Sequence, residues 1–192
     1  MHPLRFVAPS CLVLSLAQFA PQDPARQPEV LQRADRVAAV SDAHRRLGRL
    51  VGTWTIELRN TPPKSAEQTG SGTVEASPIL GGRWIQLAYR FELQGRPVEA
   101  MQLLGFDALR QLYTASWRDD LSTWAVDCAG IPLDASPDVL RMHGSLADAR
   151  DPTGRPFRLE IDLTSKDIVT ARVFDSENGE EFLLQTQTWA RR

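Results

Sequence analysis

The stretch Gly52-Thr53-Trp54-Thr55-Ile56-Glu57-Leu58 marks the point where a helical pattern ends and a series of β-strand patterns begins. Gly52 interrupts the helical pattern. Trp54, Ile56 and Leu58 then fall on alternate positions, which places them on one face of a strand. A large indole on the first strand, directly after a helix has brought the chain to one end of a sheet, predicts a plug for one end of a β-barrel.

About ten strand-like runs follow Gly52, and no helical segment between them is long enough to form a crossover. The runs span residues 52–60, 69–77, 83–94, 97–107, 111–118, 122–131, 138–147, 156–164, 167–175 and 180–190. Tight reversals separate several of them, at Gly81-Gly82, Gln94-Gly95 and Asn178-Gly179. Because parallel pairing needs connections of about a dozen residues or more, the runs predict an antiparallel, up-and-down meander.

The strand patterns are apolar on one face only, as in Phe157, Leu159, Ile161 and Leu163 of the eighth run. An open meander of this length would leave two long edges and a wide apolar face in water, and closure removes both. We therefore predict an all-β fold with one antiparallel barrel. A two-sheet sandwich shares the alternation and is the alternative, although Greek-key returns are not evident.

Ahead of the strands, residues 29–51 show a helical pattern with Ser41-Asp42 as an N-cap. We expect a short N-terminal helix that caps one end of the barrel, with His44 on its solvated face. Arg45, Arg46 and Arg49 lie near the helix's negative end, where cations are favoured. The predicted organisation is a signal peptide over 1–20, a flexible spacer and helix approach over 21–40, and a barrel domain over 41–192.

Residues 1–20 are typical of a secretory leader, with Arg5 ahead of a mostly apolar run that is too short for a permanent membrane span. Ser15-Leu16-Ala17 supplies a small-x-small cleavage site. A lipoprotein signal at Cys11 is disfavoured because the apolar run follows this cysteine. These features predict an exported protein that is periplasmic or extracellular after cleavage.

Charge and cysteine content narrow the possible functions. The chain has 22 basic and 24 acidic residues and a formal net charge of −2. Nucleic-acid binders usually have a basic face or stripe, so a nucleic-acid partner is not expected. After cleavage Cys128 is the single remaining cysteine, which excludes an intramolecular disulfide. No histidine or lysine stands near Cys128 in sequence to lower its pKa, so we expect it to be a packing residue.

Five separate motifs resemble the domain-of-unknown-function 1579 family. They are His44–Trp54, Ile79-Leu80-Gly81-Gly82-Arg83-Trp84, Gly105-Phe106-Asp107, Tyr113-Thr114-Ala115-Ser116-Trp117 and Asp151-Pro152-Thr153-Gly154-Arg155-Pro156. This resemblance implies a calycin-like barrel, often exported, in a family without an assigned activity. Gly52-Thr53-Trp54 also resembles the Gly-x-Trp of lipocalins, in which the Trp closes the barrel and a late Arg stacks over it. Arg191 is the candidate for that Arg.

A closed barrel of this size can enclose one small molecule, so the first functional hypothesis is binding of a small apolar ligand. The candidate ligand-binding residues are aromatic: Tyr89, Tyr113, Trp117 and Trp124. The alternative for these side chains is simple core packing, which would favour an interaction or scaffold module with a filled barrel.

An enzyme is the third hypothesis, based on Arg118, Asp119-Asp120, Asp127 and His143 at the open end of the barrel. No nucleophile elbow, phosphate loop or cluster of metal ligands accompanies them. The last three runs contain no histidine that could serve as an axial haem ligand. We therefore predict no catalytic residue, metal or cofactor.

Overall fold

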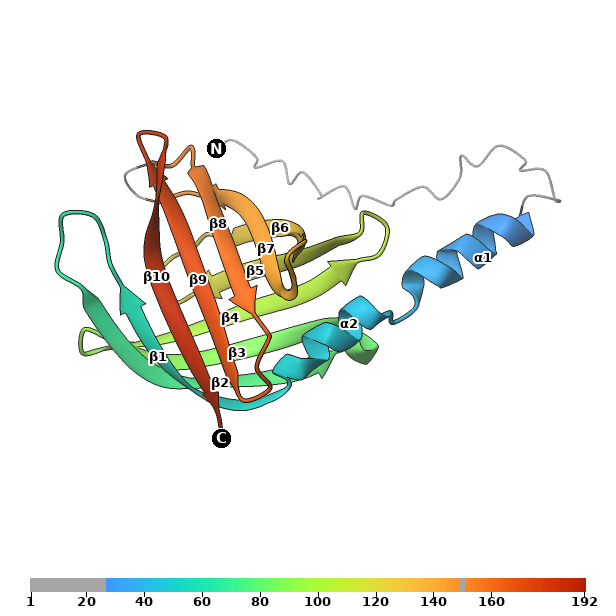
Figure 1. Cartoon of the computed structure of the whole chain (residues 1–192), viewed down its shortest axis with the longest axis horizontal. Coiled ribbons are helices and arrows are strands. Elements are labelled where there is room, and N and C mark those ends of the chain that lie inside the picture. The colour runs from blue at the N-terminus through green and yellow to red at the C-terminus, as the bar shows by residue number, and fades with distance from the viewer. Residues whose placement is uncertain (1–26, 149–150) are drawn as a thin grey trace, which may run out of the picture. The chain divides into compact units, whose positions relative to one another are not determined.

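The computed structural model describes residues 27–148 and 151–192 (Figure 1). The chain divides into two units, Met1–Ala38 and Ala39–Arg192. In the first unit the structure describes one amphipathic helix, α1 (Gln27–Ala38). The predicted signal peptide lies outside the described residues. No helix in the described part of the chain has the length and apolar character needed to cross a membrane.

The second unit is a closed antiparallel barrel in which every strand pairs with its neighbours in sequence and β1 pairs with β10 (Figure 1). This confirms the predicted all-β, up-and-down barrel and excludes the sandwich. The strands are β1 (Gly52–Asn60), β2 (Gln68–Ile79), β3 (Trp84–Leu93), β4 (Arg96–Asp107), β5 (Leu112–Asp119), β6 (Val126–Leu133), β7 (Ser136–Leu146), β8 (Arg155–Asp162), β9 (Ile168–Glu177) and β10 (Glu180–Arg191).

Two short helices follow Val40 and cover one end of the barrel, namely α2 (Asp42–Leu47) and the 3-10 helix η1 (Gly48–Leu50). The predicted continuous helical pattern is thus divided into α1, α2 and η1. Leu47 and Leu50 are buried in the barrel core. Arg49 forms an ion pair with Asp138 of β7 at 3.0 Å and donates a hydrogen bond to the carbonyl of Thr164. These contacts hold the helices over the end of the barrel at which β8 leads into β9.

His44 is buried, so the prediction that it lies on a solvated helix face is wrong. Its ring meets Phe106 of β4 edge-on, with centroids 5.7 Å apart. Its Nδ1 accepts a hydrogen bond from the backbone N–H of Ser41 at 3.1 Å. The side chain therefore completes the N-terminal capping of α2 from inside the protein, which a helical-wheel argument restricted to residues 41–51 does not reveal.

The junction between η1 and β1 is closed by three residues. The Arg191 guanidinium lies 4.1 Å from the Trp54 ring and donates to the carbonyls of Arg49 and Val51. Trp54 is fully buried and donates from Nε1 to the carbonyl of Leu50 at 2.8 Å. Gly52 has φ +136°, and a Cβ there would lie 2.7 Å from the Arg191 guanidinium. This is the Gly-x-Trp and Arg arrangement that the lipocalin resemblance implies.

Candidate ligand-binding cavity

The two ends of the barrel differ in how they are filled. At the α2 end, Trp54 and Trp189 are buried and meet edge-on at 6.3 Å. The other end contains a cavity of about 1350 Å³. Side chains from four hairpin loops reach it, those between β1 and β2, β5 and β6, β7 and β8, and β9 and β10. The cavity therefore occupies the open half of the barrel.

Aromatic side chains form much of the cavity wall. Tyr89 and Trp117 are in contact, with ring centroids 4.9 Å apart and planes inclined at 60°. Further apolar lining comes from strands on several sides of the barrel: Leu58, Phe91, Val98, Ala115, Val126, Phe157, Leu159, Ile161, Ala171 and Val173. Such a wall offers a large apolar contact area to a ligand.

The structure brings together three of the four predicted ligand-binding residues. Tyr89, Trp117 and Trp124 line the cavity, whereas Tyr113 does not. Tyr113 is buried at the α2 end, against Phe106 and within 3.4 Å of Arg46. Trp124 lies in the loop before β6 and not in a strand, so the predicted sixth run begins too early.

Two of the amide side chains that line the cavity, Gln102 and Gln187, are buried. Tyr89 donates from Oη to Gln102 Oε1 at 3.0 Å, and both side chains are buried. On β10, Trp189 donates to Gln187 Oε1 at 3.1 Å, and Gln187 donates in turn to Gln185 at 2.8 Å. Burial raises the pKa of Tyr89 well above its ordinary value, so the hydroxyl stays protonated and serves as a neutral hydrogen-bonding group.

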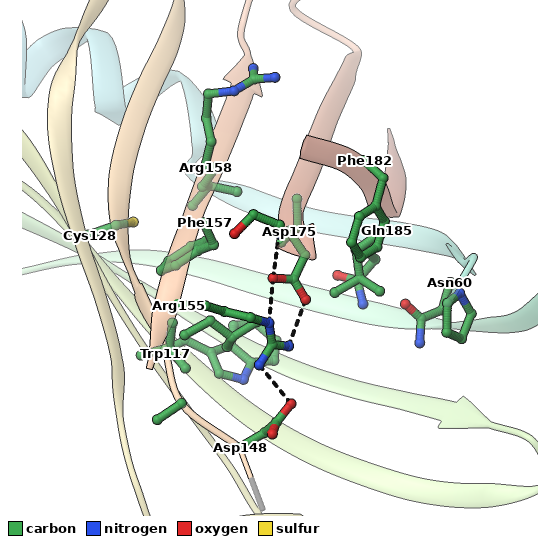
Figure 2. Close-up of a pocket in the computed structure, with 18 of the residues that line it drawn as sticks. Asn60, Trp117, Cys128, Asp148, Arg155, Phe157, Arg158, Asp175, Phe182 and Gln185 are labelled. Atoms are coloured by element: carbon green, nitrogen blue, oxygen red, sulfur yellow. Dashed lines mark hydrogen bonds and ion pairs between the residues drawn. The ribbon is translucent and has the colours of Figure 1, made fainter. Parts of the chain in front are cut away.

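Arg155 is a basic group of the cavity lining that two carboxylates hold. Figure 2 shows its guanidinium between Asp175 and Asp148. Nε and Nη2 donate to the two oxygens of Asp175 at 2.8 and 2.7 Å, and Nη1 donates to Asp148 at 3.0 Å. The hydrogen bonds to Asp175 are the main cause of the raised pKa of Arg155. A bidentate pair of this kind is strong and geometrically specific, so the guanidinium is already engaged on both sides.

A second polar group of the cavity lining lies where β5 ends. Asp119 accepts hydrogen bonds from Trp117 Nε1 at 2.7 Å, from the backbone of Leu121 at 3.1 Å and from Ser122 Oγ at 2.9 Å. Ser122 Oγ also lies 3.4 Å from the carbonyl of Trp124. Asp119 thus fixes Trp117 directly, and it also fixes the loop that carries Trp124.

Of the residues considered for catalysis, Asp119 and His143 line the cavity, whereas Arg118, Asp120 and Asp127 do not. Asp127 forms an ion pair with Arg118 at 3.8 Å and is exposed, as are Asp120 and His143. Cys128 lines the cavity, but burial raises its pKa to about 12, with the nearby Asp127 charge contributing. A thiol with this pKa is protonated at neutral pH and is a poor nucleophile. Within residues 27–148 and 151–192, no three His, Cys, Asp or Glu side chains group as metal ligands.

Sequence reasoning missed the Arg155, Asp148 and Asp175 cluster. The strand pattern contained a signal for this cluster. Arg155 lies two residues before Phe157 and Asp175 two residues after Val173, so each charged side chain is on the same strand face as an apolar residue that lines the cavity. A charged residue on the apolar face of a strand indicates either a strand end or a functional cavity. Which partners meet there depends on the closed register of the barrel.

Comparisons with known proteins agree with this architecture. A family model described as "Protein of unknown function (DUF1579)" matches residues 40–191. No curated protein matches significantly. The crystal structure of Rv2717c from M. tuberculosis is similar, with TM-score 0.56, 13% identity, and coverage of 80% of this chain and 99% of that chain. The S-type phycobiliprotein lyase CPES from Guillardia theta has TM-score 0.52, 6% identity, and coverage of 82% and 96%. At these identities the solved structures show a shared fold.

Proposed function

Because the chain belongs to the DUF1579 family of proteins of unknown function, we propose a function from its own geometry, namely binding of a small, largely apolar molecule inside the barrel. The family match confirms the resemblance found in the sequence motifs. The family description names no activity.

The cavity of about 1350 Å³ is the observation that carries this proposal. Ligand pockets for small molecules usually have volumes of ~300–1,000 Å³, and this cavity is large enough to contain one. Burial of ~200 Å² of apolar ligand surface against its aromatic wall would contribute about 5 kcal/mol before the entropic cost of association. The buried Gln102 and Gln187 amides would orient a polar group on the ligand.

The cavity also weighs against the two other hypotheses. A scaffold module was expected to have a filled barrel, and here the core is filled at the α2 end while the opposite half contains the cavity. Catalysis would need a nucleophile or an acid–base pair. The Cys128 thiol is protonated, and the Asp175 carboxylate is bound to Arg155. Neither group is therefore available as a nucleophile or as a general acid or base.

Export is part of the proposal and is supported by the leader pattern of residues 1–20. Expression of the full chain in a bacterial host with an export pathway tests it. We expect a mature N-terminus shortly after Ala17 or Ala20 in the exported fraction. Recovery of the chain with residues 1–20 intact in the cytoplasm would contradict export without affecting the binding proposal.

Binding is tested by denaturing mass spectrometry of protein purified gently from its source, combined with a fluorescence screen. We expect an apolar small molecule in the spectrum and a change in Trp117 and Trp124 emission when a matching ligand is added. A spectrum of the chain alone, together with unchanged fluorescence across a panel of lipids and metabolites, would refute the proposal.

A further inference from the structure

The charge of the cavity lining limits which apolar molecules fit. Among the described residues, six acidic and three basic side chains line the cavity, an excess of three acidic groups. The acidic ones are Asp119, Asp148, Asp151, Asp175, Glu177 and Glu181, and the basic ones are Lys64, Arg155 and Arg158. A cleft lined by an excess of one sign attracts the opposite sign and repels its own.

The three basic side chains that the structure describes in the lining do not offer a free anion site. Arg155 is shared by the carboxylates of Asp175 and Asp148. Arg158 donates to Glu181 through Nε at 2.9 Å and is also paired with Glu160. Lys64 is highly exposed in its loop and lies 4.0 Å from Glu177. An anionic head group would therefore have to displace an existing carboxylate partner.

Asp119 and Asp151 form no ion pair in the described part of the chain, unlike the other acidic side chains of the lining, and Asp119 is the one that contacts a tryptophan. Its hydrogen-bond donors are an indole N–H, a backbone N–H and a hydroxyl, all of which are neutral. No lysine, arginine or histidine in the described part of the chain forms an ion pair with it, and the adjacent Arg118 pairs with Asp127 instead. Its negative charge is therefore not balanced by an ion pair within the described part of the chain.

Tryptophan side chains accompany this carboxylate at the cavity wall. Trp117 donates to Asp119, and Trp124 lies in the loop that Asp119 and Ser122 hold in place. Indole faces attract cations by about 0.5–2 kcal/mol, most strongly where water is excluded. A carboxylate beside tryptophans is an arrangement suited to an ammonium group, whereas a carboxylate or sulfate ligand would be repelled.

We propose that the ligand is a cationic amphiphile, an apolar chain or ring system that carries an amine or quaternary ammonium group. The apolar part fills the barrel between Phe91 and Phe157, and the cation lies at Asp119 and the neighbouring tryptophans. This inference rests on the proposed binding function and adds the class of head group to it.

The test compares three probes with the same alkyl chain: decyltrimethylammonium, decanol and decanoate, each below its aggregation threshold. Affinities for the purified mature protein are measured by tryptophan fluorescence. We expect decyltrimethylammonium to bind about tenfold more tightly than decanoate, with decanol between them. Increasing ionic strength should lower the affinity for the cationic probe and leave the affinity for decanol unchanged, because salt screens only charge–charge interactions.

Variants assign the selectivity to Asp119. Asp119→Asn should lower the affinity for decyltrimethylammonium several-fold while decanol binding changes little. Asp127→Asn is the matched control, because it removes the same charge from the neighbouring strand at an exposed position that does not line the cavity. It should leave all three affinities unchanged. Thermal unfolding of both variants verifies that the barrel is intact.

The possible outcomes separate the two proposals. Equal affinities for the three probes, or a preference for decanoate, would overturn the cationic head group and leave apolar binding in place. A uniform loss of all three affinities in Asp119→Asn would show that the residue acts only on the loop, and would also overturn it. Failure of every probe to bind would instead count against the proposed function itself.

Discussion

Trp54 combines most of the interactions that close the barrel. Its ring is fully buried, lies beneath the Arg191 guanidinium, meets Trp189 and donates a hydrogen bond to Leu50. Trp54→Ala should therefore lower the free energy of unfolding by ~3–5 kcal/mol through lost burial and the cavity left behind. Chemical denaturation measures this difference.

Trp124→Ala is the matched control for Trp54→Ala, since it removes an indole that is 44% exposed. We expect a loss below ~1 kcal/mol for this loop position. A loss of similar size for Trp54→Ala would mean that the indole does not close the barrel.

His44 makes stability depend on pH. Burial lowers its pKa below the ordinary value of 6.5. Its Nδ1 accepts from the Ser41 N–H, and a protonated Nδ1 could not accept that bond. The unfolded chain therefore binds this proton more readily than the folded protein, and stability rises with pH across this window. We expect stability to fall as the pH is lowered from about 7 through the folded-state pKa.

Denaturation curves at a series of pH values test the role of His44. His44→Gln retains an acceptor at the third helical position, which is the usual capping-box arrangement, but does not titrate. The variant should lose the pH dependence in this window while α2 stays folded. An unchanged slope in His44→Gln would assign the dependence to other groups.

At the scale of elements, the pairing of β2 with β3 leaves no room for a side chain at Gly72. A Cβ at this position would lie 2.1 Å from the Arg90 carbonyl oxygen and 2.5 Å from the Phe91 Cα. These are backbone atoms in the paired strand, so relief requires opening the ladder. Gly72→Ala should cost about 1–3 kcal/mol, measured by thermal or chemical unfolding.

Gly48→Ala provides the comparison for Gly72→Ala. Gly48 has helical φ −57°, and no atom lies within 4 Å of a Cβ placed there. This substitution should be neutral or stabilise by up to ~1 kcal/mol, since alanine has the higher helix propensity. Similar losses at both positions would show that strand contact is not the cause.

Most strands were predictable because alternation is a local property. The predicted ends of β1, Gly52 and Asn60, are the observed ones. The predicted bounds of β10 differ from the observed ones by one residue, because the Asn178-Gly179 turn marks where this strand begins. The predicted start of β6 was too early, because Trp124 has high strand propensity but lies in a loop that Asp119 and Ser122 fix. Contacts formed through closure were not local, so neither the burial of His44 against Phe106 nor the carboxylates around Arg155 could be predicted.

For the whole molecule, the barrel separates stability from binding. Helices α2 and η1, Trp54 and Arg191 close one end, while the hairpin loops surround the cavity at the other. Substitutions at the closed end should therefore change the free energy of unfolding and leave ligand affinity unchanged. The two properties meet only through linkage, because a ligand that binds the folded barrel also stabilises it.

This linkage gives a prediction for the complete protein. A ligand at about a hundredfold excess over its Kd should raise the free energy of unfolding by ~2.7 kcal/mol. Val173→Trp should abolish this gain, because Val173 lines the cavity, is only partly buried and has space for a larger side chain. Thr170→Trp is the matched control on β9, since Thr170 does not line the cavity. It should retain the full stabilisation. Loss of the gain in both variants would point to a general effect on β9, and loss in neither would place the ligand outside the barrel.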